Sequence, residues 1–165
     1  MIFLTVGHQT PFDRLVRLVD DWAGSSGAEV FAQIGPTQYR PRHMESIDFL
    51  SMQEFEHKLD QATAIISHAG TGTIIQGLLR RKPILVLARL ASKGETRNDH
   101  QVGTARHFKQ SGQVLAAFDD SEFVRLLDDI ESSKPGQAVS AAASPALIDR
   151  LRRFIDETPA SRPHG

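Results

Sequence analysis

Short apolar runs alternate along the chain with segments whose apolar residues recur every three or four positions. The runs have the length and β-branched content of buried strands, and they cover residues 2–6, 28–34, 47–50, 64–66, 83–87 and 113–116. The periodic segments predict helices over residues 11–23, 51–62, 71–81, 98–110 and 120–130. Ser51 and Glu54 have the spacing of a capping box at the start of the second helix. This alternation predicts an α/β fold with a doubly wound, Rossmann-like parallel sheet, in which ligands bind at the carboxyl ends of the strands.

The junction between the fourth apolar run and the following helix is the most informative feature of the chain. A strand pattern at 64–66 stops at a turn of small residues, and a helix begins at Thr71. Such a turn leaves main-chain N–H groups unpaired at the positive end of a helix dipole. The hydroxyls of Thr71 and Thr73 converge there, and Gly70 and Gly72 allow an anion to approach the main chain. The junction therefore predicts a site for a diphosphate.

The composition of the chain argues against several classes of function but does not identify one. The 165 residues leave room for one domain with a substantial core, and 19 basic against 20 acidic residues provide no basic field for nucleic acid. The absence of cysteine excludes disulfides and thiolate metal sites, and no His cluster has metal-ligand spacing. The first residues lack the charged region of a signal peptide, and no apolar run approaches the roughly 18 residues of a membrane span. We expect a cytoplasmic protein.

The C-terminal segment differs in composition from the rest of the chain. Residues 1–131 are predicted to form the domain, and Ser, Ala, Gly and Pro dominate residues 132–143, as is typical of a linker. Residues 144–157 predict an amphipathic helix, and residues 158–165 a flexible tail. The apolar face of this helix carries Leu147, Leu151, Phe154 and Ile155. That face either folds back onto the domain or docks onto another protein.

Three motifs, in a fixed order, carry a resemblance to a known family. They are the strand–turn–helix junction at residues 66–73, the pair Lys82-Pro83, and Asn98-Asp99-His100-Gln101, supported by residues 3–7, 11–16 and 31–35. Together they resemble the nucleotide-binding C-terminal half of family 28 glycosyltransferases of GT-B fold. The chain is similar in particular to the small catalytic subunits of two-component UDP-sugar transferases. These include exopolysaccharide and capsule transferases and the eukaryotic enzyme that adds GlcNAc to a dolichol-linked sugar.

The resemblance implies a nucleotide-sugar site around the first and fourth strands. Its pyrophosphate cradle, made by main-chain amides around positions 70 to 73, carries over to Gly70, Thr71, Gly72 and Thr73. His68 would hydrogen-bond the diphosphate as a protonated imidazole or a neutral donor, with a structural role as the alternative. Gly7 and His8 belong to a loop over the donor, where His8 contacts phosphate or sugar or is simply exposed. Many relatives grip the ribose with a carboxylate at the position of Gln76, whose amide lacks the assistance of a charge.

A second set of residues is implied at the donor sugar. The family's sugar-binding pair matches Asp99 and Gln101, with His100 between them. A carboxylate beside an amide suits vicinal hydroxyls, because it offers an acceptor and a donor at fixed spacing. Alternatively, or in addition, Asp99 or the residue before it caps the following helix. Glu95 and Arg97 lie on the preceding loop, where they are expected to become ordered on substrate, with Arg97 reaching a phosphate.

The resemblance also implies inverting transfer from a UDP-sugar, without an essential metal and without a cofactor. Inversion needs a general base for the acceptor hydroxyl, which we expect from a partner subunit, with His8 as a candidate in this chain. Because a donor-binding domain alone leaves its cleft open to water, we expect activity to need a membrane-anchored subunit. That subunit would bind a lipid-linked sugar acceptor at the cytosolic face of the membrane. The alternative is a regulatory or scaffold domain that binds a UDP-sugar without turnover.

Overall fold

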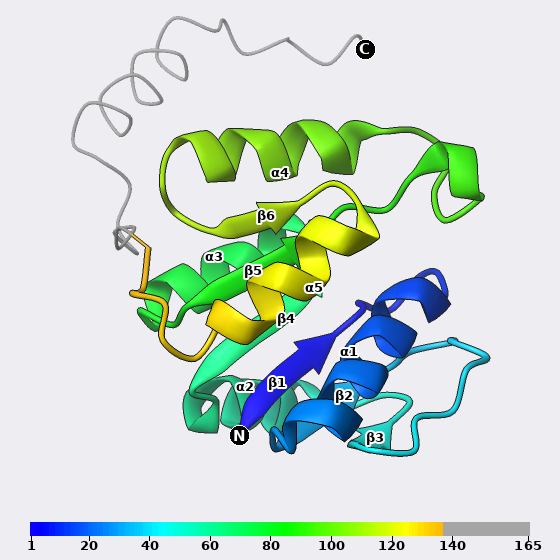
Figure 1. The fold of residues 1–165 in the computed structure, drawn as a ribbon, viewed down its shortest axis with the longest axis vertical. Coiled ribbons are helices and arrows are strands. Elements are labelled where there is room, and N and C mark those ends of the chain that lie inside the picture. The colour runs from blue at the N-terminus through cyan, green and yellow to red at the C-terminus, as the bar shows by residue number, and fades with distance from the viewer. Residues whose placement is uncertain (137–165) are drawn as a thin grey trace, which may run out of the picture.

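Six parallel strands form one sheet in the order β3-β2-β1-β4-β5-β6 in the computed structural model, which describes residues 1–136 (Figure 1). The strands are β1 (Ile2–Thr5), β2 (Val30–Gln33), β3 (Glu45–Ile47), β4 (Ala64–His68), β5 (Ile84–Leu87) and β6 (Leu115–Ala117). Every neighbouring pair of strands runs parallel. The predicted doubly wound α/β sheet is therefore confirmed, and five of the six apolar runs correspond to strands, whereas the run at 47–50 shares only Ile47 with β3.

Helices cover both faces of this sheet. In residues 1–136 they are α1 (Asp13–Ser26), α2 (Met52–Gln61), α3 (Thr71–Leu79), α4 (His100–Gln110) and α5 (Asp120–Asp129), with a 3₁₀ turn at Ala91–Lys93. The helices α1 and α5 pack into one core cluster, and α2, α3 and α4 pack into a second cluster on the opposite face (Figure 1). In β1, Ile2 and Leu4 join the first cluster and Phe3 the second. Burial on both faces explains why the strands are continuous apolar runs.

The first helix and the third strand differ from their predicted bounds. The helix begins two residues later than expected, because Phe12 is not helical and its N–H donates to the Thr37 hydroxyl at 3.1 Å. It also continues past residue 23, and it ends where Gly27 adopts a left-handed φ of 73°. The third strand covers Glu45–Ile47 rather than residues 47–50. It is an exposed edge strand, so no apolar pattern marks where it begins.

The predicted capping box at the start of α2 is confirmed. The Ser51 hydroxyl accepts from the Glu54 N–H at 3.3 Å, and the Glu54 carboxylate accepts from the Ser51 N–H at 2.8 Å. These two bonds fix where the chain leaves the edge of the sheet and crosses to β4. The crossover also places β1 between β2 and β4. The loops that follow β1 and β4 therefore diverge at the carboxyl edge of the sheet, the place where doubly wound folds bind ligands.

The C-terminal predictions fall beyond the described residues. The predicted linker at 132–143 is described only to residue 136, and the predicted helix at 144–157 and tail at 158–165 lie outside that range. The proposed docking residues Leu147, Leu151, Phe154 and Ile155 lie outside it too. Among the helices of residues 1–136, none has both the length and the apolar character needed to cross a bilayer.

Candidate functional site

Main-chain N–H groups are free at the turn between β4 and α3. The helix α3 begins at Thr71, as predicted, with Gly70 in the N-cap position, and β4 continues two residues past the predicted 64–66 to end at His68. Within residues 1–136, the N–H groups of Thr71, Gly72 and Thr73 have no hydrogen-bond acceptor. Gly70 lines the cavity at this turn, but its N–H donates to the His68 carbonyl at 2.8 Å and is not one of the free amides. Three amides remain at the positive end of the α3 dipole.

Two glycines make room for the imidazole of His68. A Cβ atom placed on Gly70 would lie 2.2 Å from the Nε2 atom of His68, and one on Gly7 would lie 2.8 Å from its Cε1 atom. Gly7 also has a left-handed φ of 80°, a conformation that side chains disfavour. A Cβ on Gly72, by contrast, would meet no atom within 4 Å. Gly70 and Gly7 therefore position the histidine, while Gly72 leaves the start of α3 open.

The partly buried position of His68 sets its protonation state. Burial, followed by the positive charge of Arg89 and the proximity of His8, lowers the pKa of His68 from 6.5 to about 4. Its Nδ1 atom is buried and has no partner within residues 1–136. The imidazole is therefore neutral at physiological pH. Of the two forms considered from the sequence, the protonated imidazole and the neutral donor, this favours the neutral donor.

His68 is expected to make the folded state sensitive to mild acid. Because its folded pKa lies below 6.5, the unfolded chain binds the proton first as the pH falls. The stability contribution is complete above about pH 7, and roughly 3 kcal/mol of unfolding free energy should be lost between pH 6.5 and pH 4. Urea denaturation of the wild type and of His68→Gln, which does not titrate, measures the difference. Parallel pH profiles for the two proteins would contradict a buried neutral imidazole.

Three adjoining cavities follow the carboxyl edge of the sheet. The central cavity, about 300 Å³, has a lining that includes His68, Gly70, Gly72, Thr73 and Arg89. The α2-side cavity, about 290 Å³, has a lining that includes Leu50, Met52, Phe55, Glu56 and Gln76. The α4-side cavity, about 680 Å³, has a lining that includes Thr10, Glu95, Arg97, Asn98 and His100. The first two cavities share Gly7, His8, Gly72 and Thr73, and the central and α4-side cavities share Gln9, Thr10 and Gln101.

His8 lies where the central and α2-side cavities meet, whereas Thr71 lines none of the three cavities. The His8 side chain is exposed, and its ring stacks on Phe49 with centroids 5.8 Å apart and an interplanar angle of 23°. An exposed imidazole beside the free amides of α3 is able to contact a bound phosphate, and both roles considered for His8 from the sequence stay open. Thr71 contributes its N–H to the helix terminus, but its hydroxyl has no position in the cavity lining.

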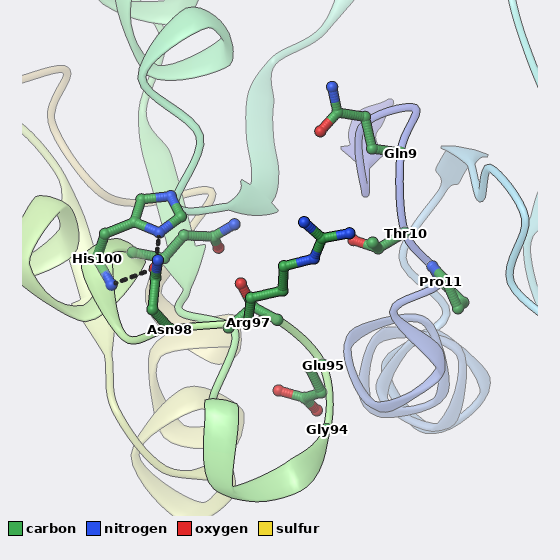
Figure 2. Close-up of a pocket in the computed structure, with 10 residues that line it drawn as sticks. Gln9, Thr10, Pro11, Gly94, Glu95, Arg97, Asn98 and His100 are labelled. Carbon is green, nitrogen blue, oxygen red and sulfur yellow. Dashed lines mark hydrogen bonds between the residues drawn. The ribbon is translucent and has the colours of Figure 1, made fainter.

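The α4-side cavity lies between the loop after β1 and the loop before α4 (Figure 2). Gln101 is buried at the shared wall, and its Oε1 atom accepts from the Arg89 N–H at 3.3 Å. Its NH₂ group remains available as a donor. His100 lines the cavity and bonds through its main chain and its ring to the Asn98 side chain (Figure 2). Two of the three predicted sugar-binding residues therefore border one cavity.

Asp99 is not in the lining of this cavity. Its Oδ1 atom accepts from the Ala91 N–H at 2.9 Å, at the 3₁₀ turn that precedes α4. Asp99 occupies the N-cap position, but its side chain makes no capping bond, and α4 begins at His100 rather than at Asn98. The predicted N-cap position of Asp99 is thus confirmed without a side-chain capping bond, and the Asn98 side chain accepts from the N–H of His100 at 3.3 Å instead. In this conformation the carboxylate is directed to the loop rather than to a sugar.

The carboxylate of Glu95 is also bonded to other residues of the protein. Its two carboxylate oxygens accept from Arg14 of α1 at 2.6 and 2.7 Å, and Oε2 accepts from the Leu90 N–H at 2.9 Å. The expectation that Glu95 becomes ordered on substrate is therefore wrong, because α1 already supplies its partner. Arg97 is exposed, and its side chain points across the cavity toward Thr10 (Figure 2). Its contact with a phosphate stays a prediction.

The α2-side cavity contains Gln76 together with a carboxylate that the sequence did not indicate. The Oε1 atom of Gln76 accepts from Arg80, whose Nε atom is bonded to Asp60 at 2.6 Å. The Gln76 amide therefore offers mainly its NH₂ group to a ligand. Glu56 of α2 lines the same cavity and is exposed. It lies on the polar face of an amphipathic helix, where no local pattern distinguishes it from ordinary surface.

Arg89 is the second site residue that the sequence did not indicate. It lies two residues after the end of β5, it is 2% exposed, and it lines the central cavity. Its guanidinium NH2 group donates to the carbonyls of Val6 and Thr10, both at 2.8 Å, and NH1 donates to the carbonyl of Pro11. A charged residue at the carboxyl end of a buried apolar run was the available signal, since side chains there face the binding edge.

Comparison with known proteins identifies a relative by sequence. The chain is 30% identical over 102 residues to the UDP-N-acetylglucosamine transferase subunit ALG13 of Eremothecium gossypii, an alignment that covers 61% of this chain and 45% of that one. The chain thus spans less than half the length of this curated relative.

Solved structures share the fold. The solution structure of ALG13 has a TM-score of 0.58 at 21% identity, covering 91% of this chain and 93% of that one. CalG4, the calicheamicin glycosyltransferase, has a TM-score of 0.59 at 16% identity, covering 93% of this chain and 37% of that one. The UDP-GlcNAc 2-epimerase of Methanocaldococcus jannaschii, in complex with UDP-GlcNAc and UDP, has a TM-score of 0.63 at 10% identity, covering 95% of this chain and 45% of that one.

The family is shown by a match to its model. The description of that model is the glycosyltransferase family 28 C-terminal domain, and the match covers residues 1–152, well over half of the chain. The order of the matched motifs, the parallel sheet and the free amides of α3 are all consistent with it. The chain therefore belongs to glycosyltransferase family 28, whose C-terminal domain it matches.

Proposed function

We propose that this chain is the donor-binding catalytic subunit of an inverting, UDP-sugar-dependent glycosyltransferase. The observation that carries the proposal is the row of three joined cavities, with three free amides of α3 at its centre. The central cavity suits a diphosphate, because the α3 terminus and the neutral His68 both offer hydrogen-bond donors. The α2-side cavity would take the nucleoside and the larger α4-side cavity the sugar.

The proposed reaction breaks the bond between the anomeric carbon and the β-phosphate oxygen of the donor. The acceptor hydroxyl attacks the opposite face of that carbon, its proton passes to a general base, and UDP departs with the bonding electrons. The donors around the central cavity would stabilise the charge that develops on the departing diphosphate. We propose that this stabilisation needs no metal ion. His8 or a residue of a partner subunit would act as the base.

A partner subunit is part of the proposal. The relative named above is a transferase subunit, and all three cavities here open to solvent along one edge of a single domain. A membrane-anchored partner would close this edge, exclude water and present a lipid-linked or polysaccharide-precursor acceptor. The chain would then act in the cytoplasm at the membrane surface. Docking through the predicted helix at 144–157 stays a prediction.

Stepwise ligand titration tests the assignment of the cavities. Uridine should shift amide resonances mainly around Leu50, Phe55 and Gln76, UDP should add Gly72 and Thr73, and a UDP-sugar should add residues of the α4-side cavity such as Gln101. At about 100 times its dissociation constant, UDP should stabilise the fold by about 2.7 kcal/mol. That corresponds to a rise in melting temperature of roughly 5–10 °C. Identical shifts with all three ligands, or none, would contradict the proposed order.

Turnover separates an enzyme subunit from a regulatory or scaffold domain that only binds the nucleotide sugar. A glutamine at position 76 favours this alternative, because its amide lacks the charge of a carboxylate and its Oε1 atom already accepts from Arg80. UDP-GlcNAc, UDP-glucose, UDP-galactose and UDP-glucuronate should be assayed with and without the candidate partner. Sugar transfer only in the presence of the partner supports the proposal. Binding without transfer in either case supports the scaffold.

A further inference from the structure

The guanidinium of Arg89 fastens the loop that walls the central cavity. Four of its five N–H groups donate to main-chain carbonyls: NH2 bonds Val6 and Thr10, and NH1 bonds Pro11 and, at 3.5 Å, Glu95. The guanidinium also lies over the Phe12 ring, with its Cζ atom 4.5 Å from the ring centroid. These bonds define the course of residues 6–11, which contribute to all three cavities.

The charge of Arg89 is not matched by a carboxylate. Within residues 1–136, Arg89 forms no ion pair, and the nearby carboxylate of Glu95 is already bound in a bidentate pair to Arg14. Burial lowers the pKa of Arg89 to about 10, so the group remains charged at neutral pH. Burying an unpaired cation is unfavourable, and carbonyl dipoles offset only part of the cost. The positive charge thus lies at the wall of a cavity whose lining within residues 1–136 includes no carboxylate.

We infer that Arg89 is a positioning residue for the diphosphate: it holds residues 6–11 in place, and its buried charge finds its counter-ion in the bound phosphates. The inference rests on the proposed function, since it concerns the same central cavity. Because nearly all of its N–H groups are already bonded to carbonyls, Arg89 acts through the loop and through its electric field. The charge-dependent part of its effect should grow with the number of phosphate groups on the ligand.

A ligand series separates the two parts of this role. Affinities for uridine, UMP and UDP should be measured by calorimetry for the wild type, Arg89→Met and Arg89→Lys. For Arg89→Met we expect a loss common to all three ligands, from the loop, and a further loss of about tenfold for each added phosphate. Arg89→Lys keeps the charge but cannot bond the same carbonyls. It should therefore show the common loss without the phosphate-dependent one.

Arg106→Gln is the matched control, because it removes one exposed arginine of α4 that lines none of the three cavities. It should bind all three ligands as the wild type does. If Arg89→Met does not fold, as judged by its amide spectrum, Arg89→Gln replaces it as the neutral variant. Equal losses for uridine, UMP and UDP in the neutral variant would overturn the inference while leaving the proposed function intact. Absence of UDP binding by the wild type would overturn both.

Discussion

Gly70→Ala is expected to weaken UDP binding at least 30-fold and to lower the free energy of unfolding by about 1–3 kcal/mol, because it overpacks a filled space. The φ of Gly70 is −87°, which alanine adopts without strain, so the effect is steric. The added Cβ would lie 2.2 Å from the Nε2 atom of His68. The ring cannot retreat freely, since Gly7 bounds it on another side. Calorimetry with UDP and urea denaturation measure the two effects.

A rescue experiment identifies the collision as the cause. In a His68→Ala background, Gly70→Ala should cost less than about 0.5 kcal/mol, because the colliding ring is gone. Gly103→Ala, at a position where a Cβ meets no atom within 4 Å, is the control for adding a methyl group to a helix. It should be neutral or stabilising by up to about 1 kcal/mol. An unchanged cost of Gly70→Ala in both backgrounds would place the damage elsewhere than at His68.

The elements that the sequence predicted well are those whose residues carry local information. Apolar runs buried in the sheet mark five of the six strands, and the spacing of Ser51 and Glu54 marks the start of α2. The turn after His68 was predicted for the same reason, because a strand, two glycines and a helix start follow one another within eight residues. By contrast, β3 lies exposed at the sheet edge, where no burial pattern forms.

The side-chain contacts that the sequence could not predict join residues that lie far apart in the chain. Arg89 bonds carbonyls 78 to 83 positions away, and Glu95 bonds Arg14 across 81 positions. Neither pairing leaves a local pattern in the sequence. The sequence alone therefore predicts that Glu95 becomes ordered only when substrate binds. Asp99 is expected at the sugar because it matches the family's sugar-binding pair, whereas in this structure its carboxylate accepts from the N–H of Ala91. Residue type and spacing thus predicted the location of the site better than the partner of each side chain.

Glu95→Gln is expected to destabilise the fold by about 3 kcal/mol, the cost of leaving a largely buried arginine without its main counter-ion. The side chains of Arg14 and Glu95 are only 11% and 12% exposed, and they form two bonds of 2.6 and 2.7 Å. Glutamine keeps the shape of the side chain but removes its charge, so the loss reports on the pair itself. Arg14 would retain Asp120, 2.7 Å away and 44% exposed, which compensates only in part. Chemical denaturation gives the magnitude.

The consequences of this variant should extend to the loop that borders the α4-side cavity. Glu95 also holds the N–H of Leu90, so amide hydrogen exchange should accelerate over residues 90–99 while the core of β1 stays protected. Arg40→Met, which breaks an ion pair whose side chains are 64% and 56% exposed, should cost less than about 1 kcal/mol. If Glu95→Gln costs no more than this surface variant, the pair does not fix the loop. Because Gly94, Thr96 and Arg97 border the proposed sugar position, the ion pair with α1 would then have no part in shaping that cavity.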